Sequence, residues 1–177
     1  MNVMGLDLSL TSTGVALTRG DTWRVRTNAA DRLEIRLAAI VDGVHEAIDA
    51  CGADDETVEL VAIEDMVTQA KFAGATAPVH GAVRLWLWKF PLPVVLIAPK
   101  SLKLYASGNG NCDKQAMADA ALKRAGVDFG KKHDECDAWW LRAMTLDAYG
   151  EPVVDVPASQ RAAMEKVHWP QMAEAAS

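Results

Sequence analysis

Along the first thirty residues, apolar runs and alternations of five to seven residues are separated by short polar turns. Such segments are typical of β-strands, which are predicted over residues 3–9, 14–18 and 23–27. In the third segment apolar residues alternate with two arginines, so one face of that strand is polar. Because short links join antiparallel neighbours, the three strands are predicted to form an antiparallel meander.

Beyond residue 30 the apolar positions recur every three or four residues, as on one face of a helix. The first such helix runs from Leu33 through Ile48, with Gly52 just past its end. The rest of the chain predicts a strand over 58–63, a helix over 77–89, a strand over 93–98, helices over 114–125 and 134–149, and a short helix over 158–167. This order predicts an α/β fold with a five-stranded mixed sheet, three antiparallel strands followed by two parallel ones, and helices on both faces. It resembles the order of the ribonuclease H-like fold.

At 177 residues the chain is long enough for one ordinary domain with a sizeable core. We expect this domain over residues 1–150, followed by a C-terminal extension over 151–177 to which the sequence assigns no role. Neither a secretory leader nor a membrane span is predicted, because no basic start precedes an apolar run and no apolar run approaches 18 residues. The three cysteines match no zinc spacing and are typical of free thiols, so the cytoplasm is the expected location.

Charge is distributed unevenly along a chain whose net charge is −6. Residues 42–65 hold nine acidic residues and no lysine or arginine. Residues 100–132 hold seven lysines and arginines against three aspartates. An acidic protein can still present a basic face to a nucleic acid, because the local field matters more than the net charge. A solvated surface is the simpler interpretation of composition alone.

Four acidic residues stand out by their positions in the predicted elements. Asp7 interrupts the buried first strand, and Glu64 ends the fourth one. Asp134 and Asp137 lie three residues apart at the start of the last helix, so they share a face. Asp137 also begins the apolar stripe of that helix, which places it on the buried side. A favourable interaction with the helix dipole explains Asp134 well, Asp137 less well and Asp7 not at all.

The first and fourth strands are expected neighbours at the centre of the sheet, so the four carboxylates would converge where the last helix crosses. Carboxylates a few ångströms apart repel one another and would hold protons. Divalent cations remove that repulsion, and ligand sets made of oxygen suit Mg²⁺ or Mn²⁺ rather than zinc. Two such ions about 4 Å apart can activate a water and stabilise the leaving oxygen of a phosphodiester. The sequence therefore predicts a two-cation site for phosphodiester chemistry.

The chain resembles the RuvC family of Holliday junction resolvases over roughly residues 3–149. The resemblance rests on four stretches, which are residues 5–9 (GLDLS) with Thr13-Gly14, residues 62–64 (AIE), residues 134–138 (DECDA), and Lys103 with residues 108–110 (GNG) and Lys114. In combination these motifs are specific, whereas each one alone is weak.

The resemblance implies a ribonuclease H-like fold, a homodimer, and Mg²⁺-dependent symmetric nicking of four-way DNA junctions. By motif, the metal-binding carboxylates would be Asp7, Glu64, Asp134 and Asp137. Lys103 and Lys114 would contact DNA phosphate near the cut, and Lys114 could also stabilise developing charge. The short chain and its motif details would suit a member encoded by a bacteriophage, which would act in the cytoplasm of its host.

The chain departs from the family pattern beside these motifs. Leu8 replaces a proline that usually follows the first aspartate, and Asp65 replaces the glutamine that follows the glutamate, which adds a second-rank acidic candidate. Val67 stands where the family often has an aromatic residue that probes the junction centre. Phe72, beside Lys71, is the candidate to replace it by stacking on an opened base.

His133, directly before Asp134, is a second-rank candidate for proton transfer, although a surface residue at a helix start is the simpler interpretation. Two alternatives to a junction resolvase remain open at this point. One is a nuclease of the same fold that acts on forks, flaps or RNA–DNA hybrids. The other is a junction-binding or ATP-binding relative without nuclease activity. The four carboxylates argue against pure DNA binding, and the chain is too short for the two domains of the ATP-binding relatives.

Overall fold

The computed structural model describes residues 1–53, 56–66 and 73–172, and these residues form a five-stranded sheet. The strands are β1 (Val3–Asp7), β2 (Ser12–Ala16), β3 (Thr22–Arg26), β4 (Leu60–Glu64) and β5 (Val94–Ile97). Their order in the sheet is β3-β2-β1-β4-β5. The pairs β1–β2 and β2–β3 are antiparallel, whereas β1–β4 and β4–β5 are parallel. The predicted meander is confirmed, and so is the central pairing of the first and fourth strands.

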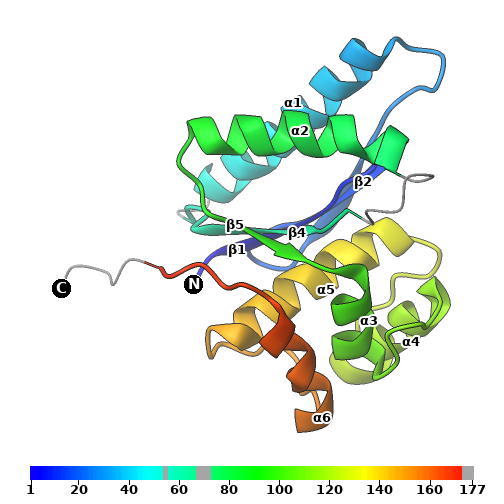
Figure 1. Cartoon of the computed structure of the whole chain (residues 1–177), viewed down its shortest axis with the longest axis vertical. Helices are drawn as coiled ribbons and strands as arrows, with labels where there is room; N and C mark the ends of the chain where they lie inside the picture. The colour runs from blue at the N-terminus through cyan, green and yellow to red at the C-terminus, as the bar shows by residue number, and fades with distance from the viewer. Residues whose placement is uncertain (54–55, 67–72, 173–177) are drawn as a thin grey trace.

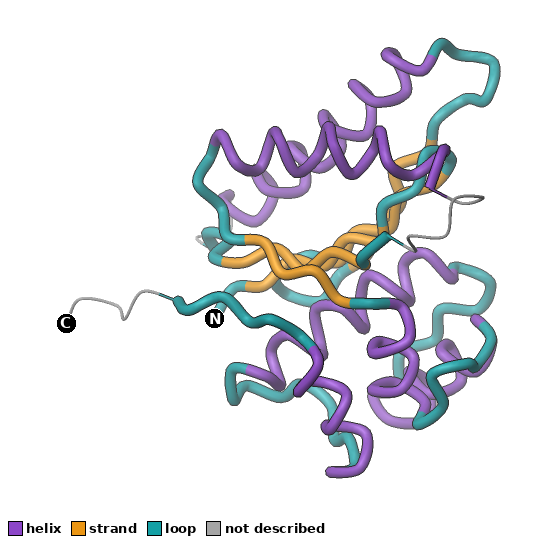
Figure 2. Tube along the Cα trace, viewed as in Figure 1, coloured by secondary structure: helices purple, strands orange, loops and turns teal. Residues whose placement is uncertain are grey.

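Helices cover both faces of the sheet, as Figures 1 and 2 show. The helices are α1 (Leu33–Ala53), α2 (Ala73–Lys89), α3 (Pro99–Ser107), α4 (Lys114–Ala125), α5 (His133–Ala148), α6 (Ala158–Arg161) and the 3-10 helix η1 (Ala162–Lys166). The first two lie on one face and all the others on the opposite face. Helix α1, which holds much of the acidic stretch over 42–65, thus lies on the opposite face of the sheet from α5 and from the helices of the basic stretch. Within the described ranges no helix combines the length and the hydropathy that crossing a bilayer requires.

Strand alternation divides the buried side chains into two apolar clusters, one on each face of the sheet. In β1, Met4 and Leu6 pack toward α1 and α2, whereas Val3 packs toward α5. Asp7 follows the same alternation as Val3 and therefore faces α5. Trp140 on α5 is completely buried in the cluster on that face.

The helix boundaries differ from the sequence prediction in three places. Helix α3 was not predicted, because its nine residues follow β5 directly and the apolar stretch ending at Pro99 indicated only a strand. Its short apolar stripe becomes clear only when Leu102 and Tyr105 are seen buried. Helix α2 begins four residues earlier than predicted, and Gly52 lies inside the last turn of α1 instead of just past it.

Two glycines allow α5 to lie directly on the backbone of the central strands. A β-carbon at Gly5 would collide with the carbonyl oxygen of Ala138, and one at Gly14 would collide with that of Asp134. The turn between β1 and β2 is held by Thr13, whose hydroxyl donates to the Ser9 carbonyl at 2.9 Å. The glycines thus fix both the height and the direction of α5 above the ends of β1 and β2.

The segment after α5 packs against α3, α4 and α5. Val154, Val156 and Ala163 are buried in the apolar cluster on the α5 face. Arg161 lies 2.8 Å from an oxygen of Asp147, a residue of α5. The division into a domain over 1–150 and an extension over 151–177 stays a prediction.

Candidate active site

Asp7 and Glu64 end two neighbouring parallel strands and therefore lie at the same edge of the sheet. The register of β1 on β4 aligns Leu6 with Ile63, so the next residues of both strands also lie side by side. Both side chains face α5, because the alternate positions before them pack against that helix. Asp7 is only 8% exposed, so its carboxyl group is largely removed from water.

Asp134 lies in the first turn of α5 and Asp137 follows it on the same face, above that edge. Gly14 lets β2 touch the backbone of α5 at Asp134, and in the β1–β2 register Gly14 is the partner of Asp7. Asp137, one turn along, is buried as the apolar stripe predicts. Three elements, β1, β4 and α5, therefore bring the four predicted carboxylates together.

Burial and mutual repulsion raise the pKa values of three of these groups. Burial is the largest cause that raises the pKa of Asp7 well above its usual value, and Glu64, Asp137 and Asp134 raise it further. Burial, followed by repulsion from Asp137, raises the pKa of Glu64 to about 7. Burial also raises the pKa of Asp137, with Lys114 opposing the shift. The cluster thus carries more negative charge than the neighbouring cations of the protein balance.

Two lysines of the basic stretch border this cluster. Lys114, the first residue of α4, places its Nζ 3.4 Å from Asp134 Oδ1 and 3.6 Å from Asp137 Oδ2. Burial lowers the pKa of Lys114, but the attraction of the acidic residues outweighs burial, so the pKa lies above its usual value. Lys103 on α3 lies near enough to lower the pKa values of Glu64 and Asp137. Lys114 therefore remains charged beside the carboxylates.

The second-rank candidates are placed less centrally. Asp65 follows β4, and by strand alternation its side chain faces the α2 side of the sheet. There burial lowers the pKa of His80, and Asp65 opposes that shift. Its Oδ1 accepts the N–H of Met66 at 2.8 Å, and the structure does not bring it into the carboxylate cluster. His133 begins α5, and its buried Nδ1 has no hydrogen-bond partner among the described residues. Three further positions of the sequence argument, Val67, Lys71 and Phe72, lie outside the described residues.

Sequence reasoning missed Glu135, which lies between the candidate ligands and is only 4% exposed. The Thr22 hydroxyl donates to Glu135 Oε2 at 2.8 Å, and Arg24 Nε lies 3.0 Å from Oε1. Lys132 Nζ lies 3.7 Å from Oε2. Glu135 thus anchors the first turn of α5 to the edge strand β3. Only the packing of α5 on the sheet shows that β3 supplies these partners, so no local sequence signal could have identified them.

The four carboxylates are ligands of the type that a hard divalent cation prefers, although they are not close enough to one another to coordinate an ion as they stand. Within residues 1–53, 56–66 and 73–172, no three acidic, histidine or cysteine side chains are grouped closely enough to hold an ion as they stand. Burial is the main cause of the raised pKa values, and repulsion among the carboxylates adds to it. Carboxylate oxygens are the ligands that Mg²⁺ and Mn²⁺ prefer. The residues that would hold such ions are Asp7, Glu64, Asp134 and Asp137.

The chain resembles proteins of one kind in sequence, although no family model matches it. It is 31% identical over 158 residues to the crossover junction endodeoxyribonuclease RuvC of Saccharopolyspora erythraea, which covers 82% of this chain and 77% of the relative. It is also 31% identical over 146 residues to RuvC of Nocardia farcinica, with 78% and 77% covered.

Solved structures of Thermus thermophilus RuvC share the fold. The structure in complex with a Holliday junction substrate has a TM-score of 0.63 at 20% identity, covering 89% of this chain and 99% of that one. A second structure of Thermus thermophilus RuvC has a TM-score of 0.64 at the same identity and covers that chain completely. The ribonuclease H-like fold expected from the order of elements is therefore confirmed.

Proposed function

The chain belongs to the RuvC family of crossover junction endodeoxyribonucleases, and on that premise we propose that it resolves four-way DNA junctions by hydrolysing phosphodiester bonds at the carboxylate cluster. The observation that carries this proposal is the convergence of Asp7, Glu64 and Asp137 with raised pKa values at one edge of the sheet. Such an excess of buried negative charge is costly in a protein that only binds DNA, because it repels phosphates.

We propose that two Mg²⁺ or Mn²⁺ ions per site are held by Asp7, Glu64, Asp134 and Asp137. When bound, such ions supply an activated water and stabilise the charge on the leaving oxygen. Because burial raises the pKa of Glu64 to about 7, Glu64 holds a proton below neutral pH unless a cation stabilises its charged form. The close backbone contacts of α5 with Gly5 and Gly14 hold the carboxylates of the helix at a fixed distance from those of the strands.

Lys114 and Lys103 would act on the substrate. The Lys114 side chain is 53% exposed while its ammonium lies beside Asp134 and Asp137, so a phosphate at the cluster can share that ammonium. In that position it would stabilise negative charge that develops on the phosphate oxygens. Lys103, on the neighbouring helix α3, would hold the DNA backbone beside the cut by its charge.

The substrate requires two coordinated cuts, so we propose that the protein acts as a homodimer with one site in each subunit. The exposed side of α2 offers an apolar surface for such an assembly, since Leu85 is 58% exposed and Trp88 is 76% exposed. We further propose that the enzyme acts in the bacterial cytoplasm, where its DNA substrate lies.

The direct test is incubation of the purified protein with a synthetic four-way junction in Mg²⁺ or Mn²⁺. Matched substrates in the same experiment are a linear duplex, a replication fork and a flap of the same sequence. We expect paired nicks in two strands of like polarity on the junction and little cutting of the duplex. Equal cutting of junction and duplex would contradict junction resolution, and faster cutting of forks or flaps would reassign the substrate.

A further inference from the structure

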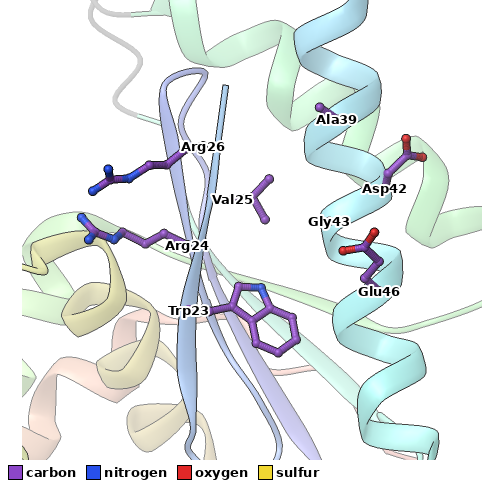
Figure 3. A pocket seen from close by; sticks show the side chains of 8 residues that line it. All are labelled: Trp23, Arg24, Val25, Arg26, Ala39, Asp42, Gly43 and Glu46. Atoms are coloured by element: carbon purple, nitrogen blue, oxygen red, sulfur yellow. The ribbon is translucent and has the colours of Figure 1, made fainter. Parts of the chain in front are cut away.

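The edge strand β3 presents two arginines on the face that looks toward the carboxylate cluster. Figure 3 shows Trp23 and Val25 directed toward α1, with Arg24 and Arg26 on the opposite side of the strand. The pocket drawn there lies between β3 and α1, and none of the four candidate ligands lines it. Arg24 lies 3.0 Å from Glu135 at its Nε, which shows that the arginine face of β3 is the face of α5.

Arg26 lies at the same end of the sheet as the carboxylates, where β1 and β4 finish. It is the last residue of β3 and pairs in register with Ser12, the first residue of β2. Two residues further along β2, Gly14 pairs with Asp7. Two strand spacings and a two-residue offset separate the Cα atoms of Arg26 and Asp7 by about 12 Å. A long arginine side chain at that distance can reach DNA bound at the cluster without entering it.

Arg24 and Arg26 differ in their partners, although they are two residues apart on one strand. Arg24 is paired with a buried carboxylate, whereas the guanidinium of Arg26 has no ion pair or hydrogen bond to any residue that the structure describes. Beside it, the buried Oγ of Ser12 also lacks a hydrogen-bond partner in the described ranges. An exposed guanidinium without a partner among the described residues can bind a phosphate through charge-assisted hydrogen bonds, whereas the buried Ser12 Oγ does not reach solvent.

Arg26 lies on a different element from the two lysines already described. Lys103 belongs to α3 and acts on Glu64 of β4, and Lys114 belongs to α4 and contacts Asp134 and Asp137 of α5. Arg26 and Ser12 lie on the β2–β3 side. A DNA strand whose phosphate rests at the carboxylates can therefore meet positive charge from β3 in addition to the lysines.

We propose that Arg26 binds a backbone phosphate of the DNA a few nucleotides from the one being cut, so that the strand is held at β3 as well as at the lysines. The inference rests on the proposed function, because it assumes that DNA occupies the carboxylate cluster. The inference adds a phosphate-binding residue on β3, a strand that the Arg24–Glu135 ion pair holds against α5. Backbone contacts of this kind set the position of the strand and carry no sequence information.

The test is equilibrium binding of a labelled four-way junction at several salt concentrations, without divalent metal so that no cutting occurs. The proteins compared are the wild type, Arg26→Ala, Arg26→Lys, and the control Lys89→Ala, which removes an exposed charge at the end of α2. We expect Arg26→Ala to bind about tenfold more weakly and its log–log salt slope to be smaller by about 1. Arg26→Lys should keep the slope, and Lys89→Ala should match the wild type.

Thermal unfolding of each variant accompanies the binding curves. A melting temperature close to that of the wild type shows that the loss of affinity does not come from a loss of folding. An unchanged salt slope in Arg26→Ala, in a protein whose wild type binds the junction, would overturn this inference alone. A wild type that binds no branched DNA would overturn the proposed function and this inference together.

Discussion

The two ends of α5 bury carboxylates in opposite ways. Near the C-terminal end, Asp147 is matched by partners from the protein itself. Arg161 Nε lies 2.8 and 3.1 Å from its two oxygens, and the Tyr105 hydroxyl donates to it at 2.9 Å. Near the N-terminal end, Lys114 Nζ lies 3.6 Å from Asp137 and also lowers the pKa of Asp7, but burial raises the pKa values of both carboxyl groups above their usual range.

This difference separates a structural carboxylate from a functional one. A buried charge costs several kcal/mol unless partners compensate it, so a fold that leaves such a cost in place needs another use for the charge. Glu135 makes the contrast sharper, because it lies in the same helical turn as the candidate ligands and is matched by Thr22, Arg24 and Lys132. The excess charge is therefore specific to the residues that would bind cations and is not a general property of this end of the helix.

The largest effect is expected where the unmatched charge is removed. Asp7→Asn keeps the shape of the side chain and deletes one candidate ligand, so the rate of junction cutting should fall about 10³-fold or more, because metal-based stabilisation is worth several kcal/mol. Gel assays of cutting in Mg²⁺ measure this loss, and Asp49→Asn on the exposed side of α1 is the matched control. A variant that cuts within tenfold of the wild type would remove Asp7 from the site.

The sequence was sufficient to predict most of the fold and the four carboxylates of the candidate site, but not the contacts that surround them. The strands and the long helices follow from periodicity, and Asp7 stood out because an acidic residue inside an apolar strand has no structural explanation. Helix α3 was missed because it follows β5 directly, and the partners of Glu135 could not be predicted, because they depend on how α5 lies across the sheet. That packing is decided by close backbone contacts at Gly5 and Gly14, which leave no periodic signal.

A smaller and purely structural effect is expected at the other end of α5. Arg161→Ala removes the cation that matches Asp147 and leaves the buried carboxylate with the Tyr105 hydroxyl. The free energy of unfolding should fall, because the buried carboxylate loses the cation that compensates its charge. Denaturant unfolding measures this change. Junction cutting at low temperature should remain close to that of the wild type, and a loss comparable to that of Asp7→Asn would contradict the division between the two ends.

The smallest effect is expected in the pH dependence of the metal-free protein. Burial, with repulsion from Asp137, raises the pKa of Glu64 from 4.5 to about 7, so the native state favours its protonated form. That contribution to stability is complete below about pH 4 and is lost as the pH rises through 7. Between pH 5 and pH 8 the melting temperature of the wild type should therefore fall by a few degrees relative to Glu64→Gln. If the melting temperatures of the two proteins change with pH in the same way, the claim that the Glu64 carboxylate lacks a compensating partner is contradicted.

Titration of Mn²⁺ into the metal-free protein by calorimetry at pH 8 tests the role of the cluster most directly. The variants compared are Asp7→Asn, Asp137→Asn and Arg161→Ala. If the unmatched carboxylates hold cations, the wild type and Arg161→Ala will bind Mn²⁺ alike, and both aspartate variants will lose at least about tenfold in affinity. Equal binding by the wild type and Asp7→Asn, or no binding by the wild type at millimolar Mn²⁺, would contradict a cation site at this end of α5.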